Sequence, residues 1–246
     1  MTYFISAPFG NYLRFKQATS VTGTWTVSPR PGRLIQIIRT LRYVRTPYGW
    51  SWRNKLGLRN PGLREGMWRT DYQSVLSVAA VEPLDWEKIQ LSISQERNLE
   101  LNVSCPNLDA HDDTTTWSGF DKFPERMHGR WCIVKIPPTA TTELIDRLAD
   151  QGYTQIHASN TLPSPEGGIS GKSLVPHTLR IIDYVKSTHP HIEVIAGGGI
   201  TTPRDRDCYL DAGADHISLG SVSFTPWRIP KIIGGRDAIQ NRSTPV

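Results

Sequence analysis

The sequence predicts an α/β protein whose eight parallel strands close into a barrel. Eight short segments are rich in β-branched and other apolar residues, and helix-like segments alternate with them from the third strand onward. This alternation implies parallel pairing, and eight such units can form a (β/α)8 TIM barrel. A chain of 246 residues suits one barrel, which takes about 200–250 residues. We therefore expect residues 1–246 to form a single domain.

The predicted strands end where proline, glycine or asparagine follows, because these residues leave a strand ladder or form turns. In the fourth strand, Leu99, Leu101 and Val103 alternate with polar residues, and Pro106 stops the strand near Cys105. The eight strands are expected at residues 3–6, 20–26, 74–81, 99–105, 131–136, 155–158, 192–196 and 216–219.

Four helices are expected at residues 83–97, 141–150, 175–185 and 203–212. Thr141 or Thr142 can cap the second helix, and Thr202 with Pro203 provides a cap and a first residue for the fourth. Glycines after the second and fourth helices favour their termination there. A short helix is expected after Thr225, and the first two strands are not followed by a convincing long helix.

The segment from Tyr43 to Tyr72 is expected to be an irregular basic insertion, because it is too long for a passive connection. It carries three tryptophans and six lysines and arginines against Glu65 and Asp71. Such a mixture can follow a nucleic-acid backbone. We favour the alternative that it forms an anion-attracting wall beside a small-molecule pocket, with nucleic acid unlikely as a partner.

Composition narrows the class of protein. No apolar run approaches the roughly 20 residues that span a bilayer, and the N-terminus lacks the features of a signal peptide. Three cysteines without short spacing indicate neither a disulfide framework nor a metal site, and favour a reducing cytoplasm. The net charge of +5 is compatible with acidic small substrates, phosphate or nucleic acid.

The motif Asn102-Val103-Ser104-Cys105-Pro106-Asn107 places a thiol between two amides at the end of a predicted strand. The amides can read the edge of a polar ring, and a thiol can exchange a proton near neutral pH. A buried cysteine with two turn-forming asparagines is the alternative interpretation.

Other polar residues and glycines also follow predicted strands, where active sites form in such barrels. Lys135 ends the fifth strand, and Asn160 and Thr161 follow the sixth. The turns Gly197-Gly198-Gly199 and Gly220-Ser221 follow the last two strands, and bare backbone there suits a phosphate group. A pair of tight structural turns is the alternative.

Several blocks of the sequence, in the same order, resemble dihydroorotate dehydrogenases. They include the Asn102–Asn107 motif, Lys135-Ile136-Pro137-Pro138, Ser159-Asn160-Thr161, the glycine-rich segments 167–171 and 197–200, and the upstream segments 26–31 and 54–60. The resemblance implies an FMN-binding barrel that oxidises dihydroorotate to orotate in pyrimidine biosynthesis. It also implies a homodimer, and the cysteine in the motif is typical of the soluble branch of the family.

The resemblance implies roles for individual residues. Cys105 matches the general base that removes the C5 proton while hydride leaves C6 for the flavin. The pyrimidine would be bound by Asn54, Asn102, Asn107, Asn160 and Thr161. The flavin would be bound by Lys135, Asn102, Gly171, Gly198, Gly199, Gly220 and Ser221.

Two alternatives remain open on the sequence. In the first, the chain is an FMN-dependent reductase of another dihydropyrimidine or of uridine in RNA. In the second, it is a flavin- or phosphate-binding barrel without catalytic turnover. The family usually has a further lysine after the first or second strand, where Asn11 or Val27 stands here. Lys16 and Lys55 are candidates to replace it. The sequence contains no ferredoxin-type cysteine cluster and does not identify the electron acceptor.

Overall fold

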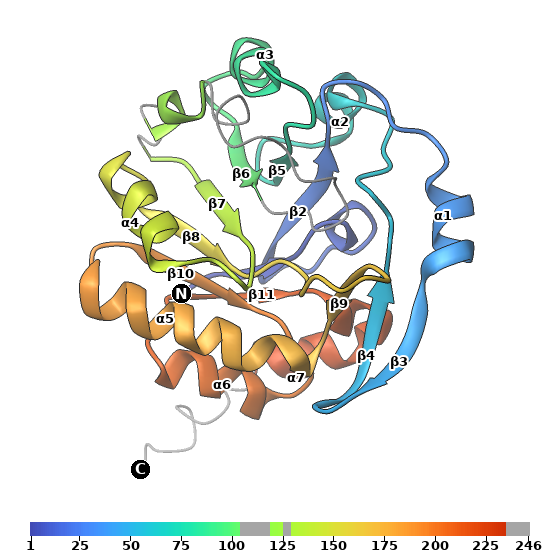
Figure 1. Cartoon of the computed structure of the whole chain (residues 1–246), viewed down its shortest axis with the longest axis vertical. Helices are drawn as coiled ribbons and strands as arrows, with labels where there is room; N and C mark the ends of the chain where they lie inside the picture. Colours follow the sequence, from blue (N-terminus) through green and yellow to red (C-terminus); the bar gives the residue numbers. More distant parts are fainter. Residues whose placement is uncertain (104–118, 125–128, 235–246) are drawn as a thin grey trace, which may run out of the picture.

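Eight parallel strands close into a barrel, which confirms the predicted fold class (Figure 1). The computed structural model describes residues 1–103, 119–124 and 129–234. Around the barrel the strands follow the order β1, β2, β5, β6, β7, β8, β10 and β11, with β11 pairing β1 to close it. Their bounds are β1 Tyr3–Ile5, β2 Ala18–Trp25, β5 Val75–Val78, β6 Asn98–Asn102, β7 Cys132–Ile136, β8 Gln155–Ala158, β10 Glu193–Gly197 and β11 His216–Leu219.

Helices surround the outside of the barrel (Figure 1). The described helices are α1 Arg33–Thr40, α2 Leu63–Arg69, α3 Asp85–Ser92, α4 Thr142–Asp150, α5 Val175–Thr188, α6 Pro203–Asp211 and α7 Ile229–Gly234. The expected caps are present, because the Thr141 side chain accepts a hydrogen bond from the Leu144 N–H and Thr202 forms a capping box with Asp205. Helix α3 is shorter than expected and α5 longer, and α1 was not expected at all.

The inside of the barrel is built in two layers. Phe4, Val21, Val75, Ile133 and Ile195 form a buried apolar layer. Side chains two residues further along a strand point to the same side. At those positions the interior becomes polar, with Ser6, Ser77 and Lys135 two residues after members of the apolar layer. Glu100 and His157, which pair with Ser77 and Lys135 on the neighbouring strands, complete this polar layer. The polar layer therefore lies toward the carboxyl ends of the strands.

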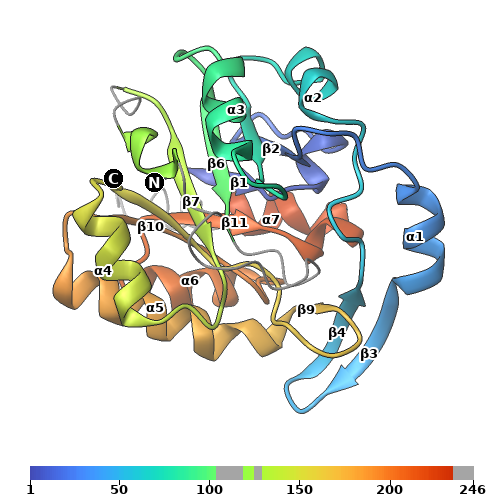
Figure 2. The ribbon, with the colours of Figure 1, turned by 45° about the horizontal axis from the view of Figure 1, so that its top comes forward.

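A small antiparallel sheet lies beside the barrel (Figures 1 and 2). Its strands are β3 Arg42–Thr46, β4 Gly49–Asn54 and β9 Gly168–Ser170, in that order. Residues 43–72, expected to be irregular, therefore hold most of β3, all of β4 and α2. The difference has a tertiary cause, because an isolated hairpin is only marginally stable and β9 comes from the distant loop after β8.

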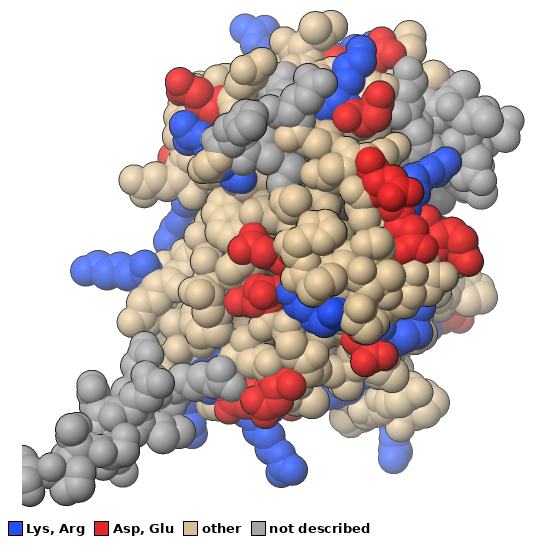
Figure 3. All heavy atoms as spheres, turned by 90° about the vertical axis from the view of Figure 1, so that its left-hand side faces the viewer, with Lys and Arg blue, Asp and Glu red and all other residues tan. Residues whose placement is uncertain are grey.

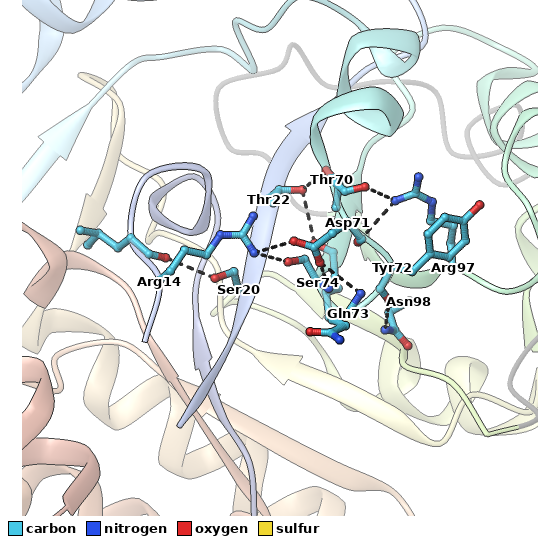
Figure 4. Close-up of polar contacts among 12 residues, drawn as sticks. Arg14, Ser20, Thr22, Thr70, Asp71, Tyr72, Gln73, Ser74, Arg97 and Asn98 are labelled. Carbon is cyan, nitrogen blue, oxygen red and sulfur yellow. Dashed lines mark hydrogen bonds and ion pairs between the residues drawn. The ribbon is translucent and has the colours of Figure 1, made fainter. Parts of the chain in front are cut away.

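The amino-terminal ends of β5 and β6 are held by polar contacts (Figure 4). Arg14 pairs with Asp71 at 3.0 Å and donates to the Ser74 hydroxyl at 2.6 Å. Arg97 donates to the Met67 carbonyl and lies over the Tyr72 ring. Because none of these residues lines the cavities described below, their role is to fix the connection from α2 to the barrel.

Within the described residues, no helix combines the length and the apolar character needed to cross a membrane. The same residues include no cluster of three or more metal-ligating side chains.

Candidate active site

Two adjoining cavities open at the carboxyl ends of the barrel strands. The larger, the glycine cavity, has a volume of about 400 Å³ and is lined in part by Gly171, Gly198, Gly220 and Ser221. The smaller, the amide cavity, has a volume of about 140 Å³ and is lined in part by Asn54, Asn102 and Asn160. Both cavities contain Lys135 and Thr161 in their walls, so the predicted site residues from the ends of five barrel strands and from the small sheet meet in one place.

The turn at Gly198 and Gly199 has a conformation and a packing that exclude side chains. Gly198 and Gly199 have φ angles of 97° and 71°, which L residues rarely adopt. A Cβ atom on Gly198 would lie 2.6 Å from the Leu174 Cβ, and one on Gly199 would lie 2.9 Å from a Val175 methyl. Gly199 supports the turn from behind and does not line the cavity. The backbone of these turns is therefore bare on the cavity side.

The glycine cavity fits a ligand that has a phosphate group and a flat ring. Its volume is that of a small nucleotide, and Phe9, Ile37, Trp52 and Leu174 form apolar walls around it. Ser218 lines the cavity, and its hydroxyl is buried and has no hydrogen-bond partner in the described structure. A buried hydroxyl without a partner is costly, so a ligand that bonds to it would remove that cost.

A buried carboxylate lies directly under the two cavities. Glu100 on β6 accepts a hydrogen bond from the Ser77 hydroxyl at 2.8 Å, and its other oxygen lies 2.7 Å from His157 Nδ1. The Lys135 ammonium is 3.7 Å from the same carboxylate and 3.4 Å from the Ser6 hydroxyl. Glu100, His157 and Lys135 are exposed by 0%, 3% and 5%. The lysine that faces the cavities is thus held from below by a counter-ion.

The surroundings of Glu100 and His157 determine their protonation states at neutral pH. Burial by itself raises the pKa of Glu100, but the Lys135 charge and the hydrogen bonds from His157 and Ser77 outweigh it and hold the pKa at about 2. Burial and the Lys135 charge lower the pKa of His157 despite its carboxylate partner. At neutral pH the histidine is therefore neutral and the carboxylate is ionised.

Side-chain amides form a chain across the amide cavity. Asn160 donates to Asn102 at 3.1 Å, and Asn102 donates to the Thr24 hydroxyl at 3.1 Å. Thr24 lies 3.0 Å from the Ser77 hydroxyl, which is bonded to Glu100. The orientation of the amides is consequently linked to the buried carboxylate.

The structure brings most predicted site residues together. Asn54, Asn102, Asn160, Thr161 and Lys135 line the amide cavity. Cys105 and Asn107 lie outside the described residues, so their roles remain predictions.

The sequence analysis missed three members of the polar layer beneath the site, Ser77, Glu100 and His157. Strand periodicity could have found two of its members, because Glu100 and His157 stand two residues before Asn102 and Ser159.

The two lysines proposed to fill the vacant family position do not reach the site. Lys16 and Lys55 are exposed and line neither cavity. Asn11 has a structural role, because its side chain donates to the Gly23 carbonyl and accepts from the Gly23 N–H. Val27 lines neither cavity either.

Comparison with known proteins gives a consistent result. The family model described as dihydroorotate dehydrogenase matches residues 9–236. The catalytic subunit of dihydroorotate dehydrogenase B (NAD(+)) from Cutibacterium acnes is 29% identical over 257 residues, covering 88% of this chain and 79% of the relative. The corresponding subunit from Latilactobacillus sakei is 28% identical over 247 residues, covering 85% and 76%.

A solved structure shares the fold. The crystal structure of ligand-free type DHODH from Eimeria tenella has a TM-score of 0.70 to this chain at 19% sequence identity. The match covers 91% of this chain and 78% of the chain in the solved structure.

Replacing Glu100 by glutamine tests the buried counter-ion. Glu100→Gln removes the carboxylate charge that compensates the buried Lys135 ammonium, and we expect the free energy of unfolding at pH 7 to fall by on the order of 3–5 kcal/mol. The wild-type advantage should shrink as the pH falls from 4.5 toward about 2, where the native carboxylate takes up its proton. Urea unfolding at a series of pH values measures this, with the exposed Glu96→Gln variant as control. An advantage of equal size at pH 3 and pH 7 would contradict the assignment.

Proposed function

Because the chain belongs to the dihydroorotate dehydrogenase family, we propose that it catalyses the FMN-dependent oxidation of dihydroorotate to orotate in pyrimidine biosynthesis. The observation that carries the proposal is the meeting of the family's strand-end residues around two adjoining cavities, one suited to FMN and one to a pyrimidine. FMN, when bound, supplies the acceptor for the hydride that leaves C6 of dihydroorotate. The protein must bind and orient the substrate, remove a proton from C5 and exclude water.

Cys105 is the residue we propose as the general base. It follows β6 by three positions, and β6 ends at Asn102 in the wall of the amide cavity. Removal of the C5 proton by the thiolate, together with loss of hydride from C6, forms the C5–C6 double bond of orotate. A positioned base of this kind contributes on the order of 10²–10⁴ to the rate.

The amide cavity is where we propose that the pyrimidine binds. Asn54, Asn102 and Asn160 present carboxamides to it, and Thr161 adds a hydroxyl. We expect Asn107 to join them from the segment after β6. Amides both donate and accept hydrogen bonds, as the alternating N–H and C=O groups of a pyrimidine ring require.

Lys135 and the glycine turns are the residues we propose to hold the flavin. The Lys135 ammonium provides positive charge beside the ring, where reduction adds negative charge. Gly171, Gly198, Gly220 and Ser221 surround the end of the cavity that suits the phosphate, with Gly199 behind them. Asn102, the last residue of β6, completes the proposed set from the wall of the amide cavity.

The remaining proposals concern assembly and setting. We propose that residues 1–246 act as one FMN-binding domain, that the protein forms a homodimer, and that it works in the cytoplasm without a nucleic-acid partner. These proposals rest on the family resemblance and on the cysteine content of the sequence.

Anaerobic reduction by substrate tests the activity. We expect the purified FMN-loaded protein to be yellow and to lose its flavin absorbance when dihydroorotate is added without oxygen. Absorbance spectra recorded before and after the addition measure this. A spectrum that stays unchanged with dihydroorotate would refute the proposed reaction, and bleaching by another dihydropyrimidine alone would favour the alternative reductase.

Replacing Cys105 by alanine tests the base. The variant should keep its flavin, because the thiol is proposed to face the substrate, and dihydroorotate should bleach it at least about 100-fold more slowly. Stopped-flow absorbance under anaerobic conditions gives the rate. Cys208→Ala is the matched control, because Cys208 is exposed on α6 and lines neither cavity. Equal rates in Cys105→Ala and wild type would remove Cys105 from the mechanism.

Replacing Lys135 by alanine tests the flavin-binding lysine. We expect FMN affinity to fall on the order of 10-fold, since a charge-assisted interaction is lost, and the reduction potential of the bound flavin to become more negative. Titration with FMN and a potentiometric titration measure the two effects, and circular dichroism confirms that the variant is folded. Lys16→Ala, which changes an exposed lysine, should alter neither quantity. Unchanged affinity and potential in Lys135→Ala would argue against the role.

A further inference from the structure

One cation in the cavity wall has no role in the site described so far. Arg33 begins α1 and lines both the glycine cavity and the amide cavity, so it lies where the two meet. Its guanidinium lies 5.7 Å from the centre of the Tyr12 ring. The side chain forms no hydrogen bond or ion pair with any residue that the structure describes. An arginine whose five donors have no partner among the described residues therefore lines both cavities.

The other cations of the site are already engaged. Lys135 is balanced by Glu100, and Arg59, which also lines the amide cavity, donates to the Pro31 carbonyl at 3.1 Å. None of the described residues that line either cavity is acidic. The described walls of the site thus carry an excess of positive charge, and Arg33 is the cation whose donors are not used within them.

The charge distribution along the chain accounts for this excess. The first 64 residues contain eleven lysines and arginines and no aspartate or glutamate, so nothing near Arg33 in the sequence can neutralise it. On the face turned away from α1, acidic and basic side chains are interspersed (Figure 3). The positive character is therefore concentrated in the part of the chain that includes α1, β3 and β4.

The position of Arg33 is fixed relative to the amides. Helix α1 is attached to the end of β4, because Gln36 donates to the Lys55 carbonyl at 2.7 Å and the Lys55 N–H donates to the Thr40 hydroxyl at 3.0 Å. The last residue of β4 is Asn54, which lines both cavities with Arg33. Asn54, whose amide can bind a polar ring, and Arg33, whose guanidinium can bind an anion, thus belong to one connected unit of α1 and β4.

We propose that Arg33 binds the carboxylate of the substrate and makes the site select dihydroorotate over uncharged dihydropyrimidines. The inference rests on the proposed function and deepens it. The carboxylate is the only full charge on the substrate, and the amides that surround the ring carry none. Guanidinium binds carboxylate through two parallel hydrogen bonds, which gives this contact both energy and direction.

Ligand binding to the FMN-loaded protein tests the proposal. Dissociation constants are measured from the change in flavin absorbance, for orotate and for its carboxamide analogue, which has the same ring and nearly the same shape without the charge. In Arg33→Gln we expect orotate to bind about 10- to 100-fold more weakly, the size of a lost charge-assisted contact. The carboxamide and FMN should bind as they do to wild type. Arg33→Lys should recover part of the orotate affinity.

Arg39→Gln is the matched control. Arg39 lies on the same helix, is exposed, and lines neither cavity, so the variant changes the net charge equally and should leave every constant unchanged. If Arg39→Gln weakens orotate as much as Arg33→Gln does, general charge attraction explains the effect and the proposal is wrong.

The remaining outcomes are equally decisive. If Arg33→Gln lowers the affinities for orotate and for the carboxamide equally, the pocket is distorted. If it lowers the affinity for FMN and leaves that for orotate unchanged, Arg33 binds the cofactor. Either result overturns the proposal. The wild-type arm tests the function itself. A wild-type protein that neither binds orotate nor is reduced by dihydroorotate refutes the reaction, whereas a reactive wild type with an unaffected Arg33→Gln refutes only this inference.

Discussion

The ion pair between Glu100 and Lys135 is the interaction on which the arrangement of the site depends. Taking a carboxylate and an ammonium out of water is expensive, and the barrel tolerates both because each compensates the other. Ser77 and His157 form hydrogen bonds with the two oxygens of this carboxylate. Through Ser77 and Thr24 the same group reaches the amide of Asn102. The polar layer therefore orients both the proposed flavin contact and the proposed substrate contacts from below.

The wall opposite this layer comes from outside the barrel. Helix α1 has no buried residue, and its position is set by contacts with the end of β4 and by the pairing of β4 with β9. Strand β9 belongs to the loop after β8. The residue that follows β9, Gly171, lines the glycine cavity. The two sides of the glycine cavity are thus connected by one small sheet, which brings Arg33 and Gly171 into the same site.

Much of the fold was predictable, because strand–helix alternation and capping residues are local signals. The barrel strands after Gln73 and the starts of α4 and α6 were expected close to where they lie, whereas β9 was expected to be a loop. Helix α1 and the β3–β4 hairpin were not expected, since they are stabilised by contacts with distant segments. In the site, the residues directly after strands were found, and Glu100 and His157 were missed. They lie within strands, at positions where a core residue is expected, and their partners come from other strands of the closed barrel.

The sequence by itself determined the order of the barrel strands and of the helices between them from β5 onward, the family, and the residues at the strand ends, because each depends on neighbours along the chain. Only the tertiary structure decided which of those ends share a cavity, which charge lies beneath Lys135, and which arginine of a strongly basic segment faces the site. Those outcomes depend on barrel closure, since the interior positions of separate strands acquire partners only when β11 pairs with β1.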